Sequence, residues 1–119
     1  MNGIKYLLDT NVIIGLLKAH GPAIRLVGNR PLKQCAVSQI SRLELLGFSG
    51  LSTTDEQVIH RFLGYCQVLM LEEKLEPKII ELRRGRSCKL PDAIIAATAL
   101  VHGLQLLTLD QRLASLINQ

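Results

Sequence analysis

Four acidic residues in this sequence have the type and surroundings of a catalytic cluster: Asp9, Glu44, Asp92 and Asp110. Asp9 and Asp110 each follow a short apolar run and precede a segment with helical character. Asp92 lies in the first turn of the apolar stretch 91–100, on one helical face with Ile95. Glu44 is flanked by leucines, where an unpaired charge would be costly. These surroundings make the four carboxylates candidates for one shared site.

Each of these acids, taken alone, has an ordinary structural explanation. Aspartate is a favoured helix N-cap, and this would account for Asp9 and for Asp110 singly. Asp92 would stabilise its own helix through the helix dipole by roughly 0.3–1 kcal/mol. The shared site is therefore inferred from the four positions together and not from any one of them.

Carboxylates gathered in one place repel each other and need a positive partner. At ~5 Å and an effective dielectric constant of ~20, each pair costs about 3 kcal/mol. No Lys or His stands beside the four acids at a spacing that would fix it in the site. Oxygen-only ligands favour Mg²⁺ or Mn²⁺ over zinc, and such an ion can activate water for attack on a phosphate. The residues thus predict metal-assisted hydrolysis of a phosphodiester.

Short apolar strands alternate with helices along the whole chain. Strands are predicted at 5–8, 34–37, 67–71 and 104–107, and helices at 12–19, 23–28, 38–46, 54–64, 72–84, 91–102 and 110–117. Thr10 or Asn11 is the expected cap of the first helix, and Thr54 opens a capping box with Gln57. The alternation predicts a parallel sheet covered by helices on both faces. Because parallel strands end at one edge, Asp9 and Asp110 are expected there, where such folds bind ligands.

The composition predicts a soluble, cytoplasmic protein with one domain over residues 1–119. Apolar residues make up 48% of the chain, which is enough for a core of its own. The longest apolar run, 93–101, is too short to cross a bilayer, and the first residues lack the pattern of a signal peptide. Three cysteines without Cys-x-x-Cys spacing argue against a disulfide framework and a zinc site.

The charge distribution favours a polyanionic substrate. The chain has 14 basic and 10 acidic residues, a net charge of +4. With the four candidate acids set aside in one site, the rest of the chain has eight more basic than acidic residues. A basic surface around an acidic pocket suits a nucleic acid that is handled through divalent cations.

The four acidic segments resemble, in order, the motifs of the PIN domain family: 7–12, 44–47, 90–97 and 106–110. The likeness is closest to the short VapC-like toxins of bacterial and archaeal toxin–antitoxin pairs. Each motif alone is weak evidence for the family, whereas the four motifs together are specific to it. The resemblance implies a three-layer α/β/α fold around a central parallel sheet of four strands. Whether a fifth strand is present stays open, because the sequence ends soon after the last motif.

The same resemblance implies an endoribonuclease that uses Mg²⁺ or Mn²⁺. By this analogy Asp9, Glu44, Asp92 and Asp110 hold the metal or position water, and the protein is a homodimer with a cognate antitoxin that blocks the site. Asn11 and Thr108 occupy motif positions and are expected to support the site through hydrogen bonds. A helix cap and an ordinary strand residue are equally good explanations for these two. The RNA target and the number of metal ions stay open.

Basic residues precede Asp92 in the sequence. Arg86 and Lys89 are expected to contact RNA phosphates beside the acids. Arg83 and Arg84 instead fit an ordinary solvated helix end, where basic residues complement the helix dipole.

Two other functions compete with this interpretation. A phosphoacceptor or phosphatase domain with Asp9 as nucleophile would typically have a second aspartate two residues on and a lysine near the last strand. This chain has Asn11, and not an aspartate, two residues after Asp9, and it has no lysine after Lys89. A catalytically silent module that binds RNA or protein would have no need of acids at all four motifs.

Overall fold

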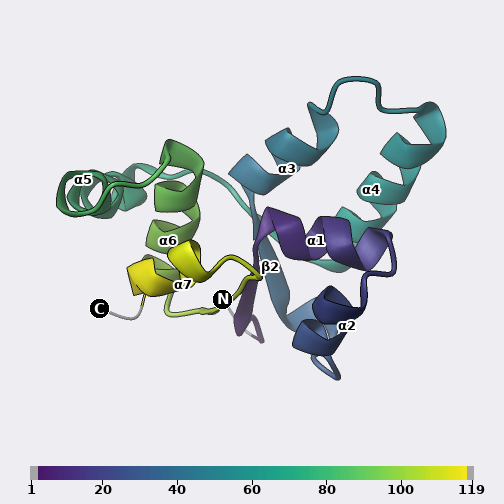
Figure 1. The fold of residues 1–119 in the computed structure, drawn as a ribbon, viewed down its shortest axis with the longest axis horizontal. Coiled ribbons are helices and arrows are strands. Elements are labelled where there is room, and N and C mark those ends of the chain that lie inside the picture. The colour runs from purple at the N-terminus through teal and green to yellow at the C-terminus, as the bar shows by residue number, and fades with distance from the viewer. Residues whose placement is uncertain (1–2, 118–119) are drawn as a thin grey trace.

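The computed structural model describes residues 3–117 as a parallel sheet between two layers of helices (Figure 1). The strands are β1 (Tyr6–Leu8), β2 (Cys35–Ser38), β3 (Gln67–Leu69) and β4 (Gln105–Leu107). The helices are α1 (Thr10–Leu17), α2 (Gly21–Val27), α3 (Gln39–Leu46), α4 (Thr53–Tyr65), α5 (Glu76–Gly85), α6 (Leu90–His102) and α7 (Gln111–Ile117). Short 3₁₀ turns, η1 (Leu32–Gln34) and η2 (Glu73–Leu75), precede β2 and α5.

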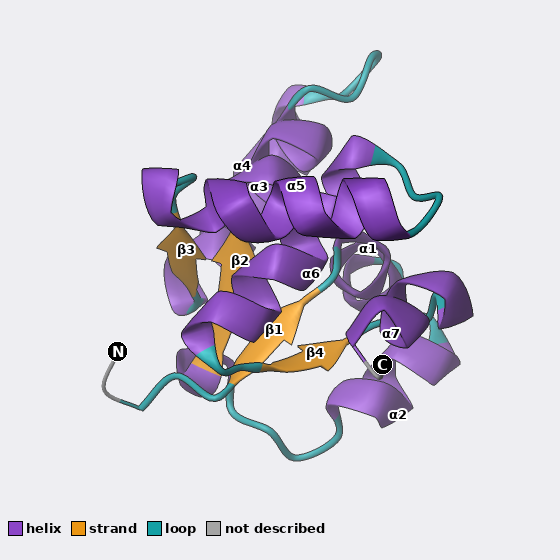
Figure 2. Ribbon diagram, turned by 90° about the vertical axis from the view of Figure 1, so that its left-hand side faces the viewer, coloured by secondary structure: helices purple, strands orange, loops and turns teal. Residues whose placement is uncertain are grey.

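All strand pairs are parallel, in the order β3-β2-β1-β4 (Figure 2). Leu8, the last residue of β1, is level with Val37 of β2 on one side and with Leu107 of β4 on the other. The chain therefore places the ends of β1 and β4 side by side at one edge of the sheet. The predicted four-stranded parallel sheet is confirmed, and within residues 3–117 no fifth strand joins it.

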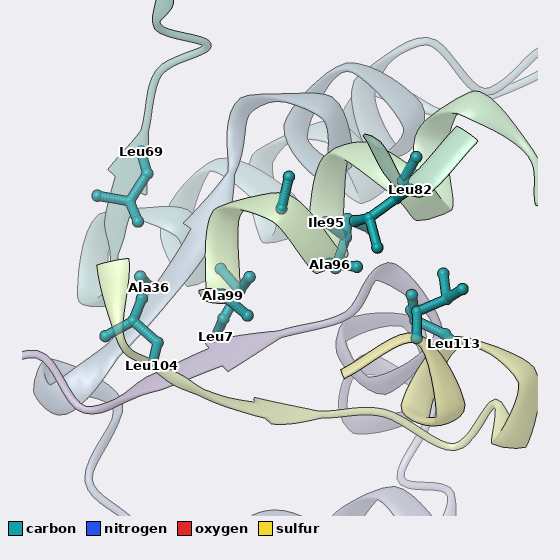
Figure 3. Packing of buried hydrophobic residues seen from close by; sticks show 12 residues of the cluster. Leu7, Ala36, Leu69, Leu82, Ile95, Ala96, Ala99, Leu104 and Leu113 are labelled. Carbon is teal, nitrogen blue, oxygen red and sulfur yellow. The ribbon is translucent and has the colours of Figure 1, made fainter. Parts of the chain in front are cut away.

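Alternating residues of each strand point to opposite faces and build two cores. Leu7 and Ala36 belong to the core under α5, α6 and α7, and Figure 3 shows Leu7 next to Ala99 of α6 in this cluster. Leu8 and Val37 belong to the other core, with residues of α1, α2 and α4. Helices thus cover both faces, as Figure 1 shows, and the predicted α/β/α arrangement is confirmed.

Small residues let helices approach closely at two places. A Cβ at Gly15 of α1 would lie 2.5 Å from the Cβ of Ala23, so only glycine lets α2 pack there. In α6 a run of seven residues, 93–99, is buried, and four of them are alanines. Because α6 leads into β4, its first turn lies at the carboxyl edge of the sheet, near the ends of β1 and β4.

Three local predictions need correction. Asp9, and not Thr10 or Asn11, caps α1, since its side chain accepts from the Thr10 N–H. Ser52, and not Thr54, caps α4, because its hydroxyl accepts from the Asp55 N–H and the helix begins one residue before Thr54. The helix expected from residue 72 starts at Glu76, after the 3₁₀ turn η2. Within the described chain, no helix is long and apolar enough to cross a membrane.

Candidate active site

Asp9 lies at the end of β1 with both carboxylate oxygens engaged. Its Oδ1 accepts a hydrogen bond of 2.8 Å from the Thr10 N–H, and its Oδ2 accepts one of 2.7 Å from the Thr108 hydroxyl. The side chain is only 5% exposed. Burial raises the pKa of Asp9 above its usual value, the two hydrogen bonds lower it, and the nearby charges of Asp92 and Asp110 raise it again. The carboxylate is therefore held rigidly and lies close to two other acids.

Thr108 connects Asp9 with Asp110. Its hydroxyl donates to Asp9 and accepts from the Asp110 N–H at 3.0 Å. Asp110 then starts α7, since its Oδ1 accepts from the N–H groups of Arg112 at 2.9 Å and Leu113 at 3.4 Å. The cap explanation for Asp110 is thus correct in geometry, and it coexists with a position beside Asp9. One threonine fixes the backbone that carries both acids.

Asp92 is half-buried in the first turn of α6 and faces the other acids. Burial raises its pKa, Asp110 raises it further, and Glu44 adds a smaller effect in the same direction. Lys89 opposes them and lowers the pKa of Asp92. Lys89 is thus near enough to act on Asp92, which agrees with its expected position beside the acids. The charges of Asp92 and Asp110 therefore act on Asp9, and those of Asp110 and Glu44 act on Asp92.

Glu44 is exposed and not enclosed by its neighbouring leucines, which corrects the expectation for this residue. Its Oε1 accepts from the Thr10 hydroxyl at 2.8 Å, and that hydroxyl lies 2.7 Å from the hydroxyl oxygen of Ser41. Thr10 has one proton and a carboxylate only accepts, so Ser41 donates to Thr10 while Thr10 donates to Glu44. Ser41 is fully buried. This chain connects Glu44 on α3 to the start of α1.

Sequence reasoning missed both Thr10 and Ser41 as neighbours of the acids. Ser41 lies three residues before Glu44, a spacing that places the two on one helical face. That spacing could have indicated Ser41, whereas the contact with Thr10 needs the packing of α1 against α3. Asn11 was expected to support the site. Its side-chain oxygen accepts from the Leu109 N–H at 3.4 Å, a long contact that reaches the loop carrying Asp110.

Two grooves adjoin the acids. A groove of about 440 Å³ contains Glu44 and is mainly apolar, with Ile14, Leu17, Phe48 and Val58 in its walls. A groove of about 550 Å³ contains Asp92 and Asp110 and is rich in basic side chains. These grooves are hereafter called the apolar groove and the basic groove. The predicted phosphate contacts Arg86 and Lys89 both line the basic groove.

Arg83 is exposed in the last turn of α5, as expected, and it also lines the basic groove. Its Nη1 donates to the Cys88 carbonyl at 2.7 Å, which ties the end of α5 to the loop before α6. The neighbouring Arg84 is exposed and does not line this groove, as expected.

A sequence profile of the PIN domain matches residues 6–117, nearly the whole chain. The chain belongs to the PIN domain family. This confirms the family that the four acidic motifs predict. No functionally curated protein matches this PIN domain.

Solved structures of toxin–antitoxin proteins are similar to this PIN domain. A toxin–antitoxin complex from Klebsiella pneumoniae has a TM-score of 0.80 and 29% identity, covering 91% of this chain and 88% of the other. FitAcB from Neisseria gonorrhoeae has a TM-score of 0.78 and 26% identity, and the match covers 95% of this chain and 93% of the other. DNA-bound VapBC from Salmonella typhimurium has a TM-score of 0.72 and 25% identity, and the match covers 85% of this chain and 83% of the other. The predicted VapC-like character is confirmed, and the family places the chain among nucleases.

The side chains of this PIN domain fit a hard divalent cation by their chemistry. The candidate ligands are all carboxylates, and burial, with a smaller effect of the neighbouring carboxylates, raises the pKa values of Asp9 and Asp92. Within residues 3–117, no three Asp, Glu, His or Cys side chains stand close enough to hold one ion directly. Mg²⁺ binds proteins through one or two carboxylates and keeps several of its waters. The arrangement therefore suits a partly hydrated ion better than an ion enclosed by protein ligands.

Proposed function

We propose that this PIN domain is a metal-dependent endoribonuclease and the toxin of a toxin–antitoxin pair. The observation that carries the proposal is that Thr108 joins Asp9 to the backbone of Asp110, while Asp92 and Asp110 line the same groove. Like charges at such a place favour a cation, and the basic groove beside them favours a polyanion. The similarity to solved toxin–antitoxin structures supports the toxin assignment.

The four acids would hold a partly hydrated Mg²⁺ or Mn²⁺ in this proposal, some of them through the waters that the ion keeps. When bound, the ion supplies positive charge that lowers the pKa of water and offsets charge developing on the phosphate. Asp9 provides a fixed oxygen, because both of its oxygens already accept hydrogen bonds from Thr10 and Thr108. Glu44 is exposed and held by one hydroxyl, so it can face a substrate that arrives from solvent.

Asn11 and Thr108 support the site in this proposal by holding the loop after β4. Thr108 does so through Asp9 and the Asp110 N–H, and Asn11 does so through the Leu109 N–H. Arg86 and Lys89 contact phosphates of the RNA strand.

An antitoxin protein is the proposed partner, and the proposed assembly is a homodimer of a cytoplasmic toxin. The apolar groove suits the antitoxin, because Phe48 and Ile14 in its walls are 69% and 37% exposed. Exposed apolar side chains around a concave surface are typical of a site for an apolar helix face. Since Glu44 lines this groove, a protein bound there would reach the acids.

Cleavage of single-stranded RNA by purified protein tests the proposal. We expect Mg²⁺-dependent cleavage that EDTA abolishes, and a loss of about a hundredfold or more in Asp92→Asn. Glu76→Gln is the matched control, since Glu76 is exposed in the first turn of α5 and lines neither groove. RNA binding without cleavage would indicate a silent module, and covalent phosphorylation of Asp9 trapped by beryllium fluoride would indicate a phosphatase-type domain. Either result would overturn the proposal.

A further inference from the structure

The basic groove combines four cationic side chains with two of the candidate acids. The cations are Arg83, Arg86, Lys89 and Arg112. Asp92 and Asp110 are the acids in its lining. The groove therefore has an excess of two positive charges directly beside the acids where a metal would bind. This is the surface that an extended polyanion would occupy as it approaches those acids.

Two stretches of sequence, 83–92 and 110–116, form this groove and are connected by hydrogen bonds. The Arg83 contact with the Cys88 carbonyl fixes the loop before α6. Arg86 Nη2 lies 3.4 Å from the Ser115 hydroxyl of α7, which links that loop to the last helix. Arg112 belongs to the first turn of α7, two residues after Asp110. The cationic side chains therefore lie around the acids on segments that hydrogen bonds connect.

The charges of these side chains are available to a ligand. The ion pairs within residues 3–117 are His60 with Glu56, Lys74 with Glu72, and Lys78 with Glu81. None of them involves a cation of the basic groove. Arg86 and Arg112 are both exposed, so a phosphate could replace water around them at little cost.

The surface on the other side of the acids differs in character. The apolar groove has one basic residue in its lining, Lys18, together with Asp55 and Glu44. It therefore offers no positive track for a phosphate backbone. The two grooves give the acid cluster one basic flank and one apolar flank.

We propose that the basic groove binds the sugar-phosphate backbone of the RNA on one side only of the bond that is cut. Arg112, which the sequence motifs do not indicate, contacts a phosphate together with Arg83, Arg86 and Lys89. The groove lining contains no aromatic side chain, so the bases find no stacking platform there. Recognition on this flank is therefore of phosphate charge and not of base sequence. The inference rests on the proposed ribonuclease function.

Binding of a single-stranded, fluorescein-labelled oligouridylate in EDTA tests this without cleavage. The test variant is Arg86→Gln with Arg112→Gln, and the matched control is Arg61→Gln with Arg84→Gln. The control arginines are exposed and lie outside both grooves. We expect the test variant to bind about tenfold more weakly at moderate salt. The slope of log K against log salt should be less steep by about 1.4 in the test variant. Each phosphate contact to a single strand contributes about 0.7 to this slope, and the variant lacks two such contacts.

Neutral linkages test the one-sided footprint. RNA with methylphosphonates on one side of the cleaved bond should bind the wild type much more weakly than RNA with the same change on the other side. The test variant should lose this asymmetry, and Mg²⁺-dependent cleavage by it should show a raised KM with little change in kcat. Equal salt slopes in the test and control variants, or equal effects of neutral linkages on both sides, would overturn the inference.

Failure of the proposed nuclease function and failure of the proposed phosphate site would give different experimental results. RNA that binds through the basic groove with the expected salt slope, and is never cut in Mg²⁺, would contradict the nuclease and leave the phosphate site standing. RNA that is cut normally by the Arg86→Gln, Arg112→Gln variant, with an unchanged KM, would contradict the phosphate site and leave the nuclease standing. Thermal unfolding of each variant by circular dichroism confirms that the fold is retained.

Discussion

The hydroxyl of Thr108 donates a 2.7 Å hydrogen bond to Oδ2 of Asp9, across 99 residues of sequence. The same hydroxyl accepts from the Asp110 N–H, so one side chain joins the ends of β1 and β4 at the candidate site. Parallel pairing of β1 with β4 makes this contact possible, because Leu8 and Leu107 are level with each other. The position of two acids therefore depends on one threonine.

Replacing Thr108 by valine should destabilise the fold and the site together. The buried Asp9 carboxylate would lose a donor, which costs about 1–3 kcal/mol. Thr108→Ser keeps the hydroxyl and should retain most of the stability and activity. Urea unfolding measures the stability, and Mg²⁺-dependent RNA cleavage measures the activity. A Thr108→Val protein as stable as the wild type would show that the hydrogen bond does not contribute.

Thr10 should position Glu44 for its role in cleavage. In Thr10→Val, Glu44 loses the 2.8 Å hydrogen bond from the Thr10 hydroxyl, and we expect kcat to fall about tenfold with little change in KM. Thr10→Ser should restore kcat, because serine keeps the hydroxyl. If Thr10 had only a structural role, Thr10→Val would lower the stability of the protein but would not lower kcat at an unchanged KM. Thermal unfolding of both variants distinguishes the two roles.

The thiol of Cys66 should resist alkylation in the folded protein. Burial raises its pKa to about 12, and the neighbouring Cys35 adds to the effect. A raised thiol pKa means less thiolate, so at about pH 8 only about one molecule in ten thousand would carry the reactive form. Iodoacetamide labelling followed by peptide mass spectrometry measures this. The same reaction in denaturing urea is the control, and equally rapid labelling in both conditions would contradict the burial of this thiol.

The apolar groove should be required for antitoxin binding and not for cleavage. Phe48→Glu places a charge in that groove and should abolish co-purification with a small protein encoded next to this chain, while Mg²⁺-dependent cleavage persists. Tyr65→Glu is the matched control, since Tyr65 is 61% exposed and does not line the apolar groove. Unchanged co-purification of the Phe48→Glu protein would exclude this groove as the antitoxin site.

Local sequence patterns predicted the positions of Asp9, Asp92 and Asp110 well. A short apolar strand followed by Asp marks the end of that strand, and parallel topology brings such ends to one edge. Pro91 marked the start of α6, and this placed Asp92 in its first turn. These inferences succeed because each depends on a few adjacent residues and on the topology of the sheet.

The surroundings of Glu44 and Arg83 were not predictable in the same way. Leucines on both sides suggested that Glu44 is enclosed, but α3 turns it toward Thr10 and solvent. Arg83 lies at an exposed helix end, as expected, but its place in the basic groove depends on the path of the loop after α5. Both outcomes depend on how helices pack against each other, and side-chain spacing along one helix does not contain that information.

Binding of Mn²⁺, followed by electron paramagnetic resonance, tests most directly whether the acids share one cation. We expect the wild type to bind Mn²⁺ in competition with Mg²⁺. Asp9→Asn and Asp92→Asn should each weaken binding at least about tenfold, and Glu76→Gln, a change outside both grooves, should leave it unchanged. Equal Mn²⁺ affinity in the wild type, Asp9→Asn and Asp92→Asn would contradict a metal site at the end of β1.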